Sequence, residues 1–341
     1  MDRVNGGAPT LVGARPREAL EGVLYEIKRV IVGQDAMLER LLVALLTGGH
    51  VLLEGVPGLA KTLTIRTLAD VLGGSFGRVQ FTPDLVPADL VGTRIYRPDS
   101  GSLDVELGPV VCNFLLADEI NRAPAKVQSA LLEVMQEDQV TIAGQSHPVP
   151  QPFLVLATQN PIESEGTYPL PEAQTDRFLM KLLVDYPTTG EEAAVVGRSL
   201  EPPAQVERRV EAAELLAFRD HVTSVYVDRA VIGYAVSLAD ATRNPGAWGL
   251  GELGSYIEYG VSPRGPIGLV QAARALALLR GRSHAVLADV RDLAPDVLRH
   301  RLVLSYEALS DGVTGDHVLE QVIAAVEPDA REEAPAEELV A

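Results

Sequence analysis

The chain has 341 residues, of which 47% are hydrophobic and 22% are charged, proportions that are typical of a folded protein and argue against global disorder. Its net charge of −18 at pH 7 disfavours a broad nucleic-acid-binding surface. The single cysteine, Cys112, excludes an intrachain disulfide framework and is typical of a reducing compartment. No apolar run reaches the roughly 18 residues of a membrane helix, and the first residues lack a signal-peptide pattern, so we expect a cytoplasmic protein.

The beginning of the sequence predicts a flexible arm and then two helices. Residues 1–16 are small and aperiodic and include Gly and Pro, which is typical of a flexible arm. Apolar residues recur at helical spacing over Ala19–Val32 and again over Asp35–Leu46. The pair Gly48-Gly49 should end the second helix, because glycine readily adopts the backbone conformation found at helix C-termini.

Five short apolar runs follow, and they predict a parallel sheet. They lie at His50–Glu54, Arg78–Thr82, Phe114–Glu119, Phe153–Thr158 and Phe178–Val184. Several are continuously apolar rather than alternating, which is typical of strands that are buried on both faces. The stretch Pro124–Glu137 has the apolar periodicity of a helix, with a proline in its first turn. We therefore expect an α/β fold with a five-stranded parallel sheet.

Two predicted hairpins interrupt this alternation, and the strand-like runs cease after residue 187. The hairpins turn at Asp99-Ser100-Gly101 and at Ala143-Gly144-Gln145. From there to Val326 the patterns are mostly helical. These features predict four parts: an arm at 1–16, an α/β core at 17–187 with hairpins near 94–107 and 139–149, a smaller all-helical domain at 188–326, and an acidic tail at 327–341.

The strongest motif directly follows the first predicted strand and precedes the helical stretch Leu63–Leu72. It consists of Gly55, Val56, Pro57, Gly58, Leu59, Ala60, Lys61 and Thr62. A glycine-bearing loop at a helix N-terminus supplies backbone N–H groups that converge on phosphate oxygens. Lys61 supplies positive charge for the β- and γ-phosphates, and Thr62 supplies a hydroxyl for Mg²⁺. The motif therefore predicts a phosphate-binding loop.

One position departs from the usual P-loop pattern. Ala60 stands where glycine normally precedes the lysine. Alanine fits this position if its φ is negative and is strained if φ is positive. The competing interpretation, a simple turn before a helix with an ordinary lysine, is disfavoured by the preceding strand and by the intact Lys61-Thr62 ending.

Polar residues at the ends of two later strands complete a candidate catalytic site. Asp118 and Glu119 end the third apolar run, and Asn160 follows the fourth. Parallel strands present their carboxyl ends at the edge where open α/β sheets bind ligands. Asp118 could hold Mg²⁺, Glu119 could polarise the attacking water, and Asn160 could orient that water. Taken singly, each is also typical of a solvated strand end or of a turn.

Together, these motifs resemble those of AAA+ ATPases, and more narrowly those of the MoxR family, in which Ala commonly precedes the P-loop lysine. The resemblance covers residues 17–326 and rests on the order of the P-loop and four further runs. These runs are Phe81–Leu85, Asp118–Ala123, Ala157–Pro161 and Leu170–Phe178. It implies a P-loop core with a helical lid, Mg²⁺-dependent ATP hydrolysis and a hexameric ring with ATP between subunits.

The resemblance also implies roles for further residues. Arg177 resembles an arginine finger, which reaches the γ-phosphate bound by a neighbouring subunit, and its alternative is an ion pair within the chain. Arg264 resembles the sensor-2 arginine, acting on its own or on a neighbour's nucleotide, and could instead be a surface residue. Val32 and Gly33 resemble an adenine-packing segment or a simple turn, and Arg122 could contact a neighbouring subunit.

The two predicted hairpins bear on the substrate. In related rings such insertions face the pore or the substrate, and neither hairpin here carries a cluster of lysines and aromatic residues, as a DNA-pumping loop would. The resemblance therefore implies a chaperone-like ATPase that remodels, matures or activates a protein client, with von Willebrand factor A-domain proteins as the partners implied by the family. The alternatives are a nucleotide-dependent scaffold with slow turnover, a magnesium-chelatase-like motor and a DNA-acting AAA+ motor.

Overall fold

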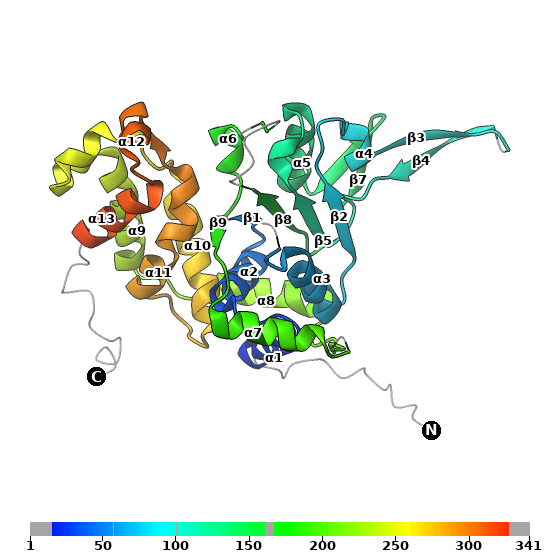
Figure 1. Cartoon of the computed structure of the whole chain (residues 1–341), viewed down its shortest axis with the longest axis horizontal. Coiled ribbons are helices and arrows are strands. Elements are labelled where there is room, and N and C mark those ends of the chain that lie inside the picture. Colours follow the sequence, from blue (N-terminus) through cyan, green and yellow to red (C-terminus); the bar gives the residue numbers. More distant parts are fainter. Residues whose placement is uncertain are drawn as a thin grey trace, which may run out of the picture.

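The computed structural model describes residues 16–56, 58–99, 101–160, 167–168, 170–202 and 204–326. The predicted tail at 327–341, nearly all of the predicted arm at 1–16 and the P-loop residue Pro57 lie outside the described residues. Figure 1 shows an α/β part and a mostly helical part side by side.

The centre of the α/β part is a five-stranded parallel sheet, which confirms the predicted fold class. Its strands are β1 (Val51–Gly55), β2 (Phe76–Gln80), β5 (Phe114–Asp118), β8 (Leu154–Gln159) and β9 (Met180–Val184). They are ordered β2-β5-β8-β1-β9, and every neighbouring pair is parallel. All the carboxyl ends therefore meet at one edge of the sheet, and all the amino ends meet at the other.

Both faces of the sheet are buried, which explains the continuous apolar runs. Leu116 packs into a core on one face, whereas its neighbour Leu115 packs into a core on the other. The first core includes residues of α1 (Pro16–Lys28), α2 (Asp35–Thr47) and α3 (Lys61–Leu72), and the second includes residues of α4 (Pro87–Val91) and α5 (Ala125–Glu137). Successive residues of a strand point to opposite faces, so a strand covered on both sides must be apolar throughout.

The first two helices are separated by a tight turn. The helix predicted over Ala19–Val32 ends at Lys28, because the turn that follows places Gly33 and Gln34 in the left-handed region, at φ 65° and 56°. The second helix ends as predicted, with Gly48 in the left-handed conformation at φ 71° and its N–H bonded back to the helix.

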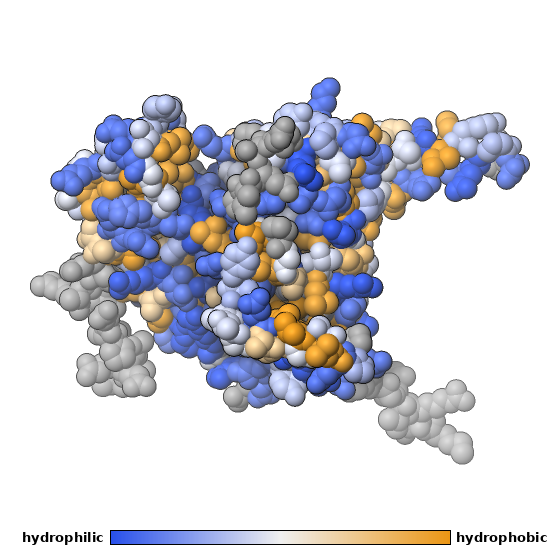
Figure 2. All heavy atoms as spheres, in the orientation of Figure 1, coloured by the Kyte–Doolittle hydropathy of each residue, from blue (hydrophilic) through white to orange (hydrophobic). Residues whose placement is uncertain are grey.

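Two antiparallel hairpins leave the sheet where the sequence predicts them. The first pairs β3 (Gly92–Arg97) with β4 (Ser102–Leu107), and the second pairs β6 (Gln139–Ile142) with β7 (Gln145–Pro148). The β3–β4 hairpin projects well beyond the α/β part (Figure 1). Its surface is largely hydrophilic with some apolar atoms (Figure 2). Tyr96 and Leu103 of this hairpin are exposed.

The remainder of the chain is mostly helical. It contains α6 (Glu172–Thr175), α7 (Thr189–Ser199), α8 (Ala212–Ser224), α9 (Arg229–Arg243), α10 (Arg264–Leu279), α11 (Leu287–Leu298), α12 (Tyr306–Asp311) and α13 (Gly315–Ala325). Short 3-10 helices lie at Ile120–Arg122 (η1), Pro245–Trp248 (η2), Gly251–Ser255 (η3) and Arg299–Arg301 (η4), and an antiparallel pair joins β10 (Ile257–Tyr259) to β11 (Val303–Leu304). Helices α7 and α8 lie near α1 and α2, whereas α9 to α13 form a helical body on the side of the molecule away from the β3–β4 hairpin (Figure 1). This helical body shares one apolar core with α1 and α2. No helix in the described parts is both long enough and apolar enough to cross a membrane.

Charged residues join this helical body to the α/β part. Arg40 of α2 is buried and binds Asp292 at 2.7 Å and Asp296 at 2.9 Å, both on α11. Arg280 in turn binds Glu39 of α2 at 3.0 Å. Because Arg40 binds two carboxylates at hydrogen-bonding distance, its buried charge is balanced by partners of opposite charge.

Candidate functional site

A cavity of about 490 Å³ opens at the carboxyl edge of the sheet. It brings together nine of the predicted site residues, which are Gly55, Gly58, Leu59, Ala60, Lys61, Thr62, Asp118, Glu119 and Asn160. Its remaining lining residues are Leu63, Arg78, Gln80, Thr158 and Gln159. Its volume is within the usual range for a small-molecule site.

The P-loop backbone has the shape of a cradle. Gly55 lies so close to β9 that a Cβ atom here would be 2.5 Å from the carbonyl oxygen of Val184. Gly58 has a φ of +91°, which favours glycine. Ala60 has a φ of 54°. Its φ is therefore positive, which is the strained alternative for an alanine at this position. For a residue with a Cβ, that conformation costs about 1–2 kcal/mol.

Lys61 begins α3 and turns back toward the loop that precedes it. Its Nζ donates a hydrogen bond to the carbonyl oxygen of Gly55 at 2.5 Å. Burial lowers the pKa of the Lys61 ammonium, and the nearby carboxylates of Asp118, Glu119 and Glu54 oppose that shift. The cation is therefore held inside the cavity and is electrostatically coupled to the acidic residues across it.

Two of those acids, Asp118 and Glu119, are connected through Thr158, which is not among the predicted site residues. Asp118 accepts a hydrogen bond from Thr158 Oγ1 at 2.7 Å, and the same oxygen accepts the backbone N–H of Glu119 at 2.9 Å. Glu119 has a φ of 56°, which is strained for a residue with a Cβ. Such strain persists only where surrounding contacts enforce it, and it is common at functional sites.

Two residues of β2 that are not among the predicted site residues also reach this cavity. Arg78 binds Asp118 at 2.7 Å, and Gln80 Nε2 donates to Glu119 Oε2 at 2.7 Å. Arg122 donates to the same Glu119 oxygen at 3.0 Å, which places it next to the acidic pair. One feature of the sequence could have indicated these two residues. Arg78 and Gln80 are polar residues two positions apart, and alternate residues of a strand share one face, here in the strand next to β5.

Asn160 lies where the sequence predicts it, at the carboxyl end of β8, and is 8% exposed. Val56, Val32 and Gly33 are not among the residues that line the cavity, as far as the described residues show. The turn after α1 nevertheless reaches the P-loop, because Gln34 Nε2 donates to the carbonyl oxygen of Leu59 at 3.2 Å.

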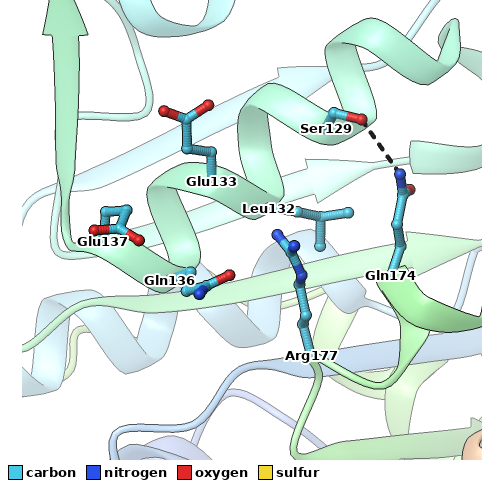
Figure 3. A pocket seen from close by; sticks show the side chains of 7 residues that line it. All are labelled: Ser129, Leu132, Glu133, Gln136, Glu137, Gln174 and Arg177. Carbon is cyan, nitrogen blue, oxygen red and sulfur yellow. Dashed lines mark hydrogen bonds between the residues drawn. The ribbon is translucent and has the colours of Figure 1, made fainter.

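Arg177 and Arg264 lie elsewhere, at the opposite edge of the sheet. Both line a second cavity of about 310 Å³, which also includes Gly48, Gly49 and His50, the residues just before β1. Arg177 also faces a hollow of about 270 Å³ on its other side, where it points toward α5 between Gln136 and Gln174 (Figure 3). The structure thus brings the two predicted arginines together and separates them from Lys61.

Asp176 joins the segment that carries Arg177 to the helical body. It binds Arg301 at 2.8 Å and Arg264 at 3.7 Å, and it accepts a hydrogen bond from Ser262 at 3.2 Å. Arg301 is 8% exposed and also donates to the carbonyl oxygens of Phe178 and Leu179 at 2.7 and 3.1 Å. The position of Arg177 is therefore fixed relative to the helices that carry Arg264 and Arg301.

The P-loop cavity fits a nucleoside triphosphate with a divalent cation. The open cradle at Gly58, the cation of Lys61 and the N-terminus of α3 together suit an anion. Among the described residues, no cluster of three or more His, Cys, Asp and Glu could hold a metal ion alone. Mg²⁺ in phosphate sites needs fewer protein ligands, because it keeps several waters and binds phosphate oxygens. The Thr62 hydroxyl and the Asp118 carboxylate supply suitable hard oxygen donors.

Comparison with known families agrees with this fold and site. Residues 50–180 match the family described as ATPase family associated with various cellular activities (AAA), and residues 254–322 match the AAA lid domain. The first match covers the P-loop, the acidic strand end and Asn160, and the second covers most of the helical body. The chain is thus built as an AAA-type P-loop protein with a helical lid.

Whole-chain relatives narrow this class to one family. The chain is 54% identical to the chaperone MoxR1 of Mycobacterium tuberculosis over 321 residues, which is 94% of this chain and 85% of the relative. It is 34% identical to the protein MoxR of Methylorubrum extorquens over 306 residues, covering 84% and 88% of the two chains. A crystal structure of a candidate ATPase from Cytophaga hutchinsonii matches with a TM-score of 0.87 at 47% identity and covers 92% of this chain and 96% of that one. The chain belongs to the MoxR family of AAA+ ATPases.

Proposed function

We propose that the protein hydrolyses ATP with Mg²⁺ and uses this reaction to remodel or activate a protein client. The observation that carries the proposal is the convergence of Lys61, Thr62, Asp118, Glu119 and Asn160 on one cavity. These five side chains come from a helix start and from the ends of two adjacent strands, β5 and β8, so that the fold itself sets their spacing.

In this proposal, the loop and the start of α3 bind the nucleotide. Backbone N–H groups of residues 58–62 hold the phosphates, and Lys61 leaves the carbonyl oxygen of Gly55 to bind the β- and γ-phosphate oxygens. Thr62 and Asp118 hold the cation, with Asp118 kept in place by Thr158. When bound, the cation neutralises charge on the phosphate oxygens. Val32 and Gly33 remain predicted adenine contacts.

Glu119 and Asn160 act on the attacking water. The Glu119 carboxylate accepts a hydrogen bond from that water and so increases its nucleophilicity. Asn160 enters the cavity from the neighbouring strand and orients the same water with its neutral amide. Positioned groups of this kind contribute about 10²–10⁴ to a rate.

Arg177 acts on the nucleotide of a neighbouring subunit. The P-loop follows the carboxyl end of β1, whereas Arg177 lines a cavity beside the residues that precede β1. A strand of this length spans on the order of 15 Å, which separates Arg177 from the nucleotide site of its own chain. Arg264 lines the same cavity as Arg177, so we assign it to the neighbour's nucleotide as well.

Oligomers are typical of AAA+ proteins, and we propose a hexameric ring. We further propose an α/β core at 17–187, a lid at 188–326 and a client that could be a von Willebrand factor A-domain protein. Hydrolysis changes the charge that Arg177 and Arg264 meet in the neighbouring subunit, and that difference can move one subunit against the next. The chaperone-like role is supported by the similarity to the chaperone MoxR1.

The test compares ATP binding and turnover in Lys61→Ala and in Lys126→Ala, a variant of an exposed lysine on α5. Loss of the phosphate-binding cation should weaken ATP binding by about tenfold or more, since a hydrogen bond to a charged group contributes about 1.5–3 kcal/mol. Lys126→Ala should bind and hydrolyse ATP as the unmodified protein does. Equal nucleotide affinity in the two variants would rule out the proposed site.

A nucleotide-dependent scaffold is the second candidate, and one observation favours it. Glu119 is held by both Gln80 and Arg122, at 2.7 and 3.0 Å, an arrangement that restrains it from contacting water. Single-turnover hydrolysis by the assembled protein separates the two candidates. A chemical step no faster than uncatalysed hydrolysis, with ATP tightly bound, would establish the scaffold.

A further inference from the structure

One side chain contacts the P-loop from outside the nucleotide cavity. Gln34 stands immediately before α2, and its main-chain carbonyl oxygen accepts the N–H of Leu38 at 3.0 Å, so that its backbone is anchored to a buried helix. Its side-chain Nε2 donates a hydrogen bond to the carbonyl oxygen of Leu59 at 3.2 Å. As far as the described residues show, Leu59 and Ala60 line the cavity and Gln34 does not. Gln34 therefore holds the loop on the side away from the cavity.

This bond sets the direction of the next N–H group. The carbonyl oxygen of Leu59 and the N–H of Ala60 belong to one planar trans peptide, so they point in opposite directions. Because Gln34 holds the oxygen on the side away from the cavity, the Ala60 N–H is turned toward the cavity. Ala60 is left-handed, with φ 54° and ψ 19°, and is followed by the first helical residue, Lys61. A left-handed residue next to a right-handed one makes successive N–H groups converge, which forms a concave site for an anion.

The same arrangement keeps Ala60 in its strained conformation. The carbonyl oxygen of Ala60 accepts the N–H of Thr64 at 2.8 Å and its hydroxyl at 3.1 Å, which fixes the peptide on the other side of Ala60. The strain can be relieved by turning over the peptide between Leu59 and Ala60, because this flip returns φ to a negative value. The flip would direct the Leu59 carbonyl oxygen, rather than an N–H, at the phosphates. The hydrogen bond from Gln34 opposes the flip, since the flip would break it.

The contact adds little to the stability of the fold. A carbonyl oxygen can only accept, so the NH₂ group of the Gln34 amide must face Leu59 and its oxygen Oε1 must point elsewhere. That oxygen is buried and has no hydrogen-bond partner among the described residues. The cost of leaving a buried acceptor unpaired is at least as large as the gain from one neutral hydrogen bond. Gln34 therefore affects the shape of the loop more than the free energy of unfolding.

We propose that Gln34 is a positioning residue, which locks the peptide between Leu59 and Ala60 so that the Ala60 N–H faces the nucleotide phosphates. The inference rests on the proposed function, because it concerns the phosphate-binding part of the same site. The lock explains how the loop keeps this shape with an alanine, rather than a glycine, before Lys61.

The experiment measures ADP binding by the full-length protein with Mg²⁺, by calorimetry and without turnover. Gln34→Met keeps the length of the side chain and removes the hydrogen-bond donor, so that the peptide is free to flip and Ala60 can relax. Only the molecules that keep the strained conformation then bind the phosphates, and the affinity for ADP should fall by about five- to thirtyfold. The crystal structure of the nucleotide-free variant should have a negative φ at Ala60.

Gln205→Met is the matched control, because Gln205 is exposed and is not among the described residues that line the cavity. It should bind ADP as the unmodified protein does. Without nucleotide, Gln34→Met and Gln205→Met should unfold at the same temperature, because the bond lost from Gln34 is offset by the removal of its unpaired oxygen.

A double variant tests whether Gln34 acts through the conformation of Ala60. Glycine adopts a positive φ without strain, so in the Ala60→Gly background the peptide flip releases no strain. Gln34→Met should then weaken ADP binding by only about twofold, as expected when the two peptide orientations are equally populated. An equal fall in both backgrounds would overturn the proposed lock.

The other outcomes are equally decisive. ADP affinity in Gln34→Met equal to that of Gln205→Met overturns the proposal, and so does a positive φ at Ala60 in the crystal structure of Gln34→Met. Inosine diphosphate carries an oxygen in place of the adenine amine, and its affinity should fall by the same factor as that of ADP. A fall confined to ADP makes Gln34 a base contact, which also overturns the proposal. If the unmodified protein binds no ADP, the proposed function fails first, and that result is seen before any variant is compared.

Discussion

Arg301 of the lid donates its Nε–H to Asp176 at 2.8 Å, and Asp176 is the residue immediately before Arg177. The same guanidinium also bonds to the carbonyl oxygens of Phe178 and Leu179. One buried side chain of the lid thus fixes the main chain on both sides of Arg177. A change in the lid reaches Arg177 through this contact.

Arg301→Met should destabilise the protein by about 3 kcal/mol, because it leaves Asp176 and several carbonyl groups without their buried cationic partner. Urea unfolding measures this loss. Arg208→Met is the control, since Arg208 is half-exposed and its closest acidic oxygen, on Glu211, is 4.0 Å away. A loss for Arg301→Met no larger than that of the control would contradict the buried role.

Glu119→Gln should bind ATP with nearly unchanged affinity and hydrolyse it about 10²–10⁴ times more slowly, because the neutral amide cannot accept the proton of the attacking water. Equilibrium binding and single-turnover hydrolysis give the two numbers separately. The same variant with ATP should hold protein clients long enough for their capture from an extract. Turnover within threefold of the unmodified protein would remove Glu119 from its assigned role.

Arg177→Ala should bind ATP normally and hydrolyse it slowly, since arginine fingers in other NTPases contribute about 10³–10⁵ to the rate. Mixing Arg177→Ala with Lys61→Ala should restore part of the turnover, because each chain keeps the half-site that the other has lost. Subunit exchange is confirmed beforehand with labelled chains. If exchange is complete and no activity returns, Arg177 does not serve a neighbouring subunit.

Ala60→Gly should leave the nucleotide-free protein as stable as before, or stabilise it by up to about 1 kcal/mol, because Ala60 has a φ of 54°. Ala194→Gly, in the interior of α7, should cost about 0.5–1 kcal/mol, as glycine does in an ordinary helix. Thermal unfolding of the two variants compares the same chemical change in opposite backbone conformations. Equal losses in both would show that Ala60 is not strained.

His50 should make stability depend on pH. Burial lowers its pKa from the ordinary 6.5 to about 4, and the hydrogen bond to the Met135 carbonyl opposes part of this shift. Nδ1 accepts the Val155 N–H, so this nitrogen carries no proton in the folded protein. Between pH 6.5 and 4 the unfolded chain therefore binds more protons than the folded one. The contribution of neutral His50 to the free energy of unfolding is complete above pH 6.5. About 3 kcal/mol of this contribution is lost as the pH falls to 4.

The check is urea unfolding across this pH range for the unmodified protein and for His50→Gln. The variant should have a shallower pH dependence, by up to about 1.4 kcal/mol per pH unit. Some slope should persist, because burial also lowers the pKa of His300. His317→Gln, at an exposed position, controls for the loss of an imidazole. A slope for His50→Gln equal to that of this control would contradict the prediction.

The sheet could be predicted because each of its strands is a separate apolar run. Phe114–Asp118 and Leu154–Gln159 are buried on both faces. Because side chains on both faces are buried, nearly every residue of these strands is apolar. The cavity residues at the ends of these strands followed from the topology, since parallel strands gather their carboxyl ends at one edge.

Other features depend on tertiary contacts that a linear pattern does not carry. The spacing of Arg78 and Gln80 shows that they share a face of β2, but their contacts with Asp118 and Glu119 depend on the neighbouring strand, which only the sheet order supplies. The sign of the Ala60 φ could not be predicted, because a sequence gives the residue type and not its dihedral angles. The partnership of Asp176 and Arg301 joins residues 125 positions apart, with no local signal.

The ion pairs between α2 and the lid differ in how strongly they feel dissolved salt. Arg40 is 7% exposed and Arg280 is 38% exposed, and ions in solution screen a buried pair much less than an exposed one. Raising the ionic strength therefore loosens the outer pairs of Arg280 first and spares the inner pairs of Arg40. The buried pairs of Arg40 therefore still connect α2 to α11 at salt concentrations that already weaken the outer pairs.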